Sequence, residues 1–210
     1  MIRMNELWVS VDHIKGICTG PVEMSPGTGF LVRKGRLHFP HGGPICIFAL
    51  QNLLPFLCIK EREDRAKDPA DWVDRLHEVQ CPDPKGLVDW RIESRPLGST
   101  AMDAEPYPVS PPTSPREGQA SGTPNMLYLT VQDVEGVCPA GMRPGVRAIL
   151  YGSSLYLPQA FCLYAMAALI PLLPAMQRQI ESDDWMASEN VVACPDPAGG
   201  VMIRIDRVKA

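Results

Sequence analysis

This chain of 210 residues is 45% hydrophobic, with a formal net charge of −4 at pH 7. That composition is typical of a folded globular protein, and its length allows one large domain or two small ones. An acidic chain without a Lys/Arg cluster argues against nucleic-acid binding, where a basic face is expected.

The chain opens with MIRMNELWVSVDH, which lacks the apolar run of a signal peptide. We therefore expect a cytoplasmic protein whose cysteines are reduced or bind metal. Residues 7–11 alternate between apolar and polar side chains and predict a strand, as do residues 127–131. A Gly/Pro turn follows each of them, and second strands are predicted at 30–33 and 147–151.

An apolar helix is predicted next in each half, beginning near Pro44 or Gln159. Pro55 and Pro171 fall inside these segments and should kink or end the helices. Residues 160–176 are short for a transmembrane helix and carry two prolines, so we expect a buried helix and no membrane span.

Two more strands complete each half, at 73–80 and 87–92 in the first and at 190–193 and 201–205 in the second. The predicted unit is ββαββ, and the fold class is α+β with mostly antiparallel sheets.

The two halves repeat each other. LWVSVDHIKGIC at 7–18 returns as LYLTVQDVEGVC at 127–138, and CPDP at 81–84 returns at 194–197. The offset falls from 120 residues (Cys18 to Cys138) to 116 (Cys46 to Cys162) and 113 (Cys81 to Cys194). Small insertions in the first copy would produce this drift. We predict two tandem repeats related by a pseudo-twofold axis.

The repeats are predicted at 1–95 and 125–210. The intervening residues 96–124 contain seven prolines with Ser, Thr and Gly between them. A segment of this composition cannot build a core and is predicted to be a linker.

Six of the seven cysteines occupy matched positions. If the three cysteines of a repeat converge, they form a soft ligand set suited to zinc, copper(I) or an iron–sulfur cluster. The matched methionines Met24 and Met142 offer a fourth soft ligand. The candidate metal ligands are Cys18, Cys46, Cys81, Cys138, Cys162, Cys194, Met24 and Met142.

Two other interpretations of the cysteines remain open. They can pack as small buried side chains, as free cysteine often does and as we expect of the unmatched Cys58. Alternatively, Cys46 at a helix start is a reactive thiol with His38 or His41 as its base.

Two other matched pairs have alternative roles. Asp83 and Asp196 of the CPDP motifs can act in acid–base chemistry, but capping the turn is the preferred interpretation. Trp72 and Trp185 can line a pocket, but anchoring a strand to the core is preferred.

These motifs resemble a family of small, functionally uncharacterised prokaryotic proteins, each about one repeat long. The family has an N-terminal strand, a Cys-x-x-Gly-His-x-x-Gly-Asp element, a Cys-containing apolar helix and a Cys-Pro-Asp-Pro hairpin. In the second copy, Met142 and Val146 stand where the family has its histidine and aspartate. The resemblance implies a fold and a candidate cysteine site, with Cys3Met ligation or a cluster in place of Cys3His.

We therefore predict a soft-metal or iron–sulfur binding accessory or small subunit of a redox enzyme, with a protein partner or a homo-oligomeric assembly. The alternatives are a metal-free interaction or assembly module with structural cysteines, and a thiol enzyme that uses Cys46. The sequence leaves open whether the chain is an enzyme.

Overall fold

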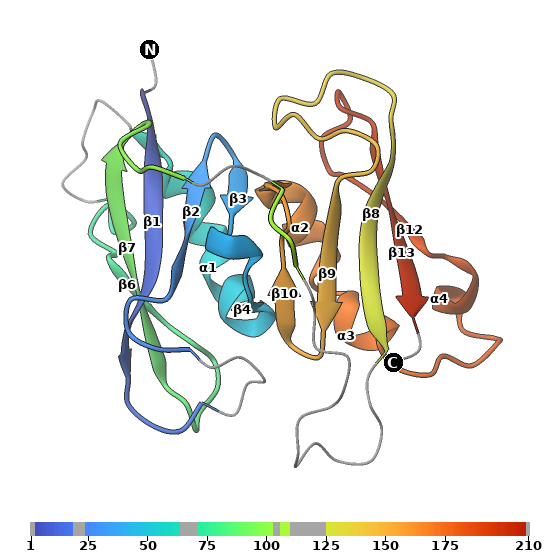
Figure 1. The fold of residues 1–210 in the computed structure, drawn as a ribbon, viewed down its shortest axis with the longest axis horizontal. Coiled ribbons are helices and arrows are strands. Elements are labelled where there is room, and N and C mark those ends of the chain that lie inside the picture. Colours follow the sequence, from blue (N-terminus) through green and yellow to red (C-terminus); the bar gives the residue numbers. More distant parts are fainter. Residues whose placement is uncertain (1–2, 19–23, 64–70, 103–105, 110–124, 209–210) are drawn as a thin grey trace.

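The computed structural model describes residues 3–18, 24–63, 71–102, 106–109 and 125–208. The chain forms an α+β fold in which two antiparallel sheets lie side by side and short helices pack against them (Figure 1). The predicted fold class is confirmed at this level. Residues 103–105 and 110–124 of the predicted linker lie outside the described ranges.

The first sheet is built mainly from the N-terminal half and has the strand order β11-β3-β2-β1-β7-β6, with β5 paired to β1. Its strands are β1 (Arg3–Ile14), β2 (Gly29–Arg33), β3 (Arg36–His38), β5 (Arg62–Glu63), β6 (Glu78–Gln80), β7 (Val88–Pro96) and β11 (Phe161–Cys162).

The second sheet is built mainly from the C-terminal half and has the order β12-β13-β8-β9-β10-β4. Its strands are β4 (Ile45–Cys46), β8 (Met126–Val134), β9 (Arg147–Tyr151), β10 (Ser154–Tyr156), β12 (Val191–Ala193) and β13 (Val201–Val208). The four strands predicted in each half therefore all exist, although β6 is shorter than predicted and β7 and β13 are longer.

The two halves exchange short strands. Strand β4 of the first half pairs with β10, and β11 of the second half pairs with β3, so that each sheet gains an edge from the other half. Backbone hydrogen bonds continue each pairing, from Ile47 N to Ser153 O and from Leu163 N to Gly35 O, both 2.9 Å. The ββαββ prediction lacks these strands, and also β3, β5 and β10, because a segment of two or three residues carries no detectable alternation.

The helices follow the exchanged strands. They are α1 (Ile47–Lys60), α2 (Leu163–Leu169), α3 (Leu173–Met176) and α4 (Trp185–Ser188), with a 3-10 turn η1 (Pro40–Gly42) before β4. Within the described part of the chain, no helix is both long and apolar enough to cross a membrane.

The matched prolines act differently on the two helices. Helix α2 ends just before Pro171, whereas α1 continues through Pro55 to Lys60. Proline removes a hydrogen bond to the carbonyl four residues earlier. Both Pro55 and Gln51 are exposed, so water can satisfy that carbonyl in α1. The second half carries Pro174 as well, which lies in the first turn of α3, where the backbone N–H has no acceptor within the helix.

One apolar cluster runs through both halves. Leu7, Val9 and Val11 of β1 are at most 2% exposed, as their alternation predicts. Their matched residues on β8 are equally buried, and both join a cluster that includes the apolar sides of α1 and α2. The two halves of the chain therefore share one core.

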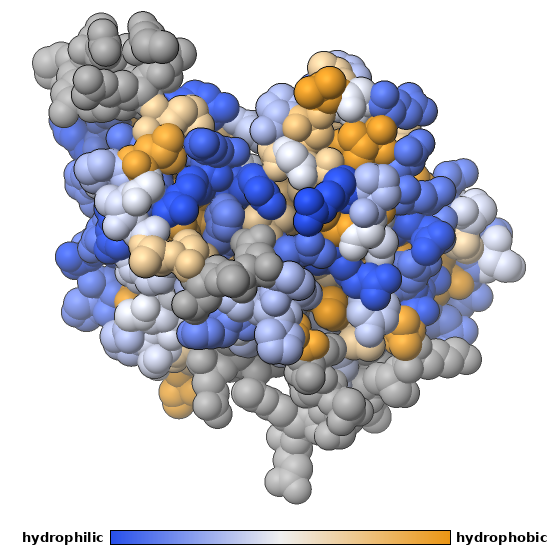
Figure 2. Space-filling model, turned by 45° about the horizontal axis from the view of Figure 1, so that its top comes forward, coloured by the Kyte–Doolittle hydropathy of each residue, from blue (hydrophilic) through white to orange (hydrophobic). Residues whose placement is uncertain are grey.

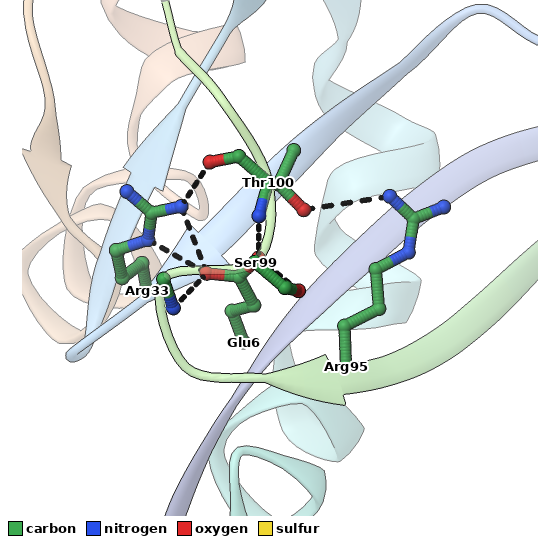
Figure 3. Close-up of polar contacts among 6 residues, drawn as sticks. Glu6, Arg33, Arg95, Ser99 and Thr100 are labelled. Atoms are coloured by element: carbon green, nitrogen blue, oxygen red, sulfur yellow. Dashed lines mark hydrogen bonds and ion pairs between the residues drawn. The ribbon is translucent and has the colours of Figure 1, made fainter.

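A buried carboxylate holds the chain where β7 ends (Figure 3). Glu6 is fully buried and accepts hydrogen bonds from Gly98 N at 2.8 Å, Thr100 N at 2.6 Å and Ser99 Oγ at 3.1 Å. The guanidinium of Arg33 lies 2.8 Å from the same carboxylate and also donates to Thr100 O. The first residues of the predicted linker are thus anchored to the first sheet.

Candidate functional site

The first cysteine of each half is placed by a glycine. After β8, Gly136 N donates to Gly199 O at 3.1 Å and Val137 N donates to Ala198 O at 3.2 Å. A Cβ at Gly136 would lie only 2.0 Å from Ala198 O, so no other residue allows this approach. The same contact recurs between Gly16 and Lys85 O, also at 2.0 Å. The Gly-x-Cys step therefore docks against the turn that follows CPDP.

The CPDP turn places the second cysteine. Cys194 N donates to Val201 O at 2.8 Å, which fixes the start of the turn, and Asp196 Oδ1 accepts from Ala198 N at 3.0 Å. In the first half, Asp83 Oδ1 accepts from Lys85 N at 3.0 Å. The aspartates are therefore turn caps, as predicted.

The third cysteine of each half begins a helix. Cys46 and Cys162 are the N-cap residues of α1 and α2, as predicted, although neither side chain makes a capping hydrogen bond. Burial raises the pKa of the Cys162 thiol, against the opposing influence of the Ala165 and Tyr164 backbone N–H groups. A buried, uncharged thiol results, where helix position alone had suggested a thiolate.

The three matched cysteines of the second half, Cys138, Cys162 and Cys194, all line one pocket. In the first half, burial raises the pKa of the Cys81 thiol, a backbone N–H at Asp83 opposes this, and the neighbouring Cys46 and Cys18 raise it further. The buried cysteines are Cys46, Cys81 and Cys162, whereas Cys18, Cys138 and Cys194 are half-buried. No group of three or more His, Cys, Asp or Glu side chains in the described ranges has the arrangement of a metal site.

A pocket of about 500 Å³ opens directly over the cysteines of the second half. The loop after β8 and the turn between β2 and β3 both lie at the end of the molecule that Figure 2 turns toward the viewer. The second half lines it with Cys138, Pro139, Ala140, Cys162, Tyr164, Cys194, Pro195 and Asp196, and the first half with Met4, Lys34, Gly35 and Arg62.

Two cations reach this pocket from the first half. Lys34 and Gly35 form the turn between β2 and β3, and Gly35 N donates to both carboxylate oxygens of Glu61 at 2.8 and 2.9 Å. Burial raises the pKa of Glu61, although the Gly35 N–H and the charge of Arg62 act in the opposite direction. The guanidinium of Arg62 lies 5.9 Å from the centre of the Tyr164 ring.

The predicted methionine ligands lie in the core. Met24 and Met142 are 8% and 5% exposed and belong to the shared apolar cluster. Met142 is not one of the residues that line the pocket. The burial of both thioethers is explained by apolar packing.

The remaining cysteine and histidine predictions have simpler outcomes. Cys58, expected in the core, is half-buried on α1 and lies 3.5 Å from Leu54 O. Cys46 is 5% exposed, so a substrate has little access to its thiol. His41 lies on η1, where its ring centre is 6.3 Å from that of Tyr107.

The tryptophans are not core anchors, and that preferred interpretation is wrong. Trp72 and Trp185 are 59% and 61% exposed. The preceding aspartates cap local turns, with Asp71 accepting from Val73 N and Asp184 from Met186 N, both at 2.9 Å.

Exposed apolar side chains recur at matched positions of the two halves. Besides the tryptophans, Ile17 and Val137 are 80% and 83% exposed, each directly before a site cysteine. Phe48 and Tyr164 are also exposed, each two residues after an N-cap cysteine. Sequence reasoning missed these pairs, although an apolar residue kept at the same position in both copies was the available signal.

Comparison of the chain with family models, with curated proteins and with solved structures gave no match.

Proposed function

We propose that the chain binds a soft metal ion or an iron–sulfur cluster through its cysteines, as an accessory or small subunit of a redox enzyme. What supports the proposal is that Cys138, Cys162 and Cys194, from three separate elements, line one pocket, and that the first half carries cysteines at the three matched positions. Thiols are the donors that copper(I), zinc and iron–sulfur clusters prefer. The pocket over the second set gives a ligand a route to it.

Binding would draw the sulfur atoms together. A thiolate–metal bond is about 2.3 Å long for zinc, so the three side chains must close around the ion. Cys138 and Cys194 stand in loops beside turns, whereas Cys162 is fixed at a helix start. Closing the three thiols around an ion therefore requires movement mainly of the Cys138 and Cys194 side chains. The metal must also displace the thiol protons, which the raised pKa of Cys162 retains at neutral pH.

The proposal is tested by metal analysis and a UV–visible spectrum of protein purified without oxygen. We expect about one or two metals per chain if one or both sets are loaded. Cys162→Ser and Cys194→Ser should remove the second-half metal, while Cys58→Ser, a control outside both sets, should retain it. Metal-free protein whose six matched thiols all titrate freely would overturn the proposal.

The matched exposed apolar side chains favour a protein partner and leave a metal-free assembly module as the second candidate. We infer that the halves are related by a pseudo-twofold axis, which is supported by the reciprocal pairing of β4 with β10 and of β11 with β3. Such an axis would place two equivalent binding surfaces on one chain. If assembly is the only function, Cys→Ser variants change stability alone, and Val137→Ser weakens recovery of a co-purifying partner.

A further inference from the structure

We propose that the pocket over the second-half cysteines binds a small organic carboxylate with an apolar body, whose carboxylate group lies against Lys34 and Arg62. Such a site goes beyond the proposed function, because it needs no metal ion.

The pocket has the size and the walls of a small-molecule site. Its volume of about 500 Å³ lies within the range of roughly 300–1,000 Å³ that is typical of such sites. Pro139, Ala140 and Pro195 line it with apolar surface, and Met4 and Tyr164 add a thioether and an aromatic ring. Side chains of these kinds pack well against a hydrocarbon body. The walls therefore favour a ligand that is largely apolar.

The ionisable side chains that line the pocket favour an anion. With the thiols protonated, the positive charges of Lys34 and Arg62 and the negative charge of Asp196 leave a net charge of +1. The Asp196 carboxylate already caps its own turn. Glu61 is fully buried and does not line the pocket, and both of its oxygens accept from Gly35 N. One carboxylate would neutralise the pocket and would accept charge-assisted hydrogen bonds from the two cations.

The backbone of Lys34 gives independent support for a role in binding. Its φ of 53° lies in the left-handed region, which a residue with a Cβ rarely adopts. The matched turn of the second half, between β9 and β10, has Gly152 at this position, with a φ of 58°. Glycine would therefore be the less strained residue at position 34. Residues held in such conformations are concentrated at functional sites and ligand clamps.

The same comparison predicts one site per chain. Ile47 N donates to Ser153 O in the first half as Leu163 N donates to Gly35 O in the second, both at 2.9 Å. The turn that contains Gly152 therefore meets the first-half cysteine helix as the Lys34 turn meets the second-half one. A glycine there supplies no cation, so we expect the first-half cysteines to lack this ligand.

The test compares 2-naphthoate with its uncharged amide, 2-naphthamide, on the full chain in the presence of EDTA. The two probes share one apolar body and differ in charge, so the ratio of their dissociation constants isolates the effect of the carboxylate. Ligand-observed NMR titrations supply both constants. We expect 2-naphthoate to bind at least about tenfold more tightly than the amide, because hydrogen bonds between ionised partners are the stronger ones.

Lys34→Gly gives position 34 the residue that the matched turn uses, so this variant should fold normally. It should lose most of the preference for 2-naphthoate, and Lys34→Gly with Arg62→Gln should bind both probes equally. Arg178→Gln is the matched control. Arg178 is exposed, stands 116 residues after Arg62 as Cys162 does after Cys46, and does not line the pocket. Arg178→Gln should keep the full preference.

Ala140→Trp locates the binding site, because the larger side chain would occupy the pocket and should abolish binding of both probes. The inference is overturned if the unchanged protein does not bind 2-naphthoate or binds both probes equally. It is also overturned if the preference survives Lys34→Gly with Arg62→Gln, or if Ala140→Trp binds 2-naphthoate normally. These measurements are made with EDTA, so none of their outcomes decides whether the cysteines bind a metal.

Discussion

Replacing Glu6 with glutamine should remove one of the strongest polar anchors of the first sheet. The carboxylate is fully buried and faces only donors, from Arg33, Gly98, Ser99 and Thr100. The side-chain amide introduced by Glu6→Gln would place its own N–H groups against some of these donors. Met126 stands at the matched position of the second half, which therefore has no counterpart of this carboxylate.

The magnitude follows from the pKa. Burial alone would raise the pKa of Glu6, but hydrogen bonds from Thr100, Gly98 and Arg33 outweigh burial and lower the pKa from 4.5 to about 2. At about 1.4 kcal/mol per pKa unit, this shift of about 2.5 units corresponds to at most about 3.5 kcal/mol. Because Arg33 is 24% exposed and partly screened, we expect about 2 kcal/mol.

The lowered pKa of Glu6 determines in which direction its contribution to stability changes with pH. The contribution is fully present above pH 4.5, the ordinary value, and is lost as the pH falls toward 2. Urea unfolding at pH 7 should therefore show Glu6→Gln to be less stable by about 2 kcal/mol, and the difference should shrink steadily below pH 4.5.

The control is Glu78→Gln. Glu78 is 61% exposed and lies 3.8 Å from Arg91, so its removal should cost less than about 0.5 kcal/mol at any pH. If the difference in the free energy of unfolding between Glu6→Gln and the unchanged protein stays constant from pH 7 to pH 3, the anchoring argument is wrong.

Three further predictions concern Gly136 in the loop after β8, the exchanged strand β11 and the thiols. In thermal unfolding, Gly136→Ala should lower the stability of the protein by at least about 1–3 kcal/mol, because the added Cβ would meet Ala198 O. Gly141→Ala is the control for space, since nothing lies within 4 Å of its added Cβ, although the positive φ of Gly141 carries a separate backbone cost. Phe161→Ala should cost about 3–5 kcal/mol, since Phe161 is fully buried on β11; a loss below about 1 kcal/mol would mean that the exchange contributes little. Metal affinity should fall steeply as the pH drops, by up to about tenfold per pH unit for each thiol displaced, and a flat profile in competition titrations would argue against thiolate ligation at Cys162.

The sequence predicts the strands that are long enough to show an alternating apolar and polar pattern. Residues 7–11 and 127–131 show alternation long enough to identify β1 and β8, and their buried sides are those expected. Strands β4 and β11 are two residues each and depend on a partner from the other half. Local periodicity carries no information about such pairing, which is decided by tertiary contacts.

The same distinction applies to the candidate site: the sequence predicts the local positions of its residues but not their long-range contacts. Matched spacing identifies the cysteines at the start of α1 and α2, because an apolar run after a turn marks a helix start. It could not show that Met142 turns into the core, since a methionine suits a core or a ligand role equally well. Nor could it reveal Lys34 and Arg62, which belong to the other half and meet the thiols only through the fold.

The strand exchange explains why the second-half pocket needs both halves. Cys162 ends β11, which pairs with β3 through Cys162 and Arg36. The turn immediately before β3 contains Lys34 and Gly35, and Leu163 N is bonded to Gly35 O at 2.9 Å. The pairing that completes the first sheet therefore also carries the Lys34 turn to the N-cap cysteine of the second half. Neither half supplies both parts alone, because the first half provides the cations and the second half provides the thiols. The pairing of β11 with β3 brings them together within one molecule.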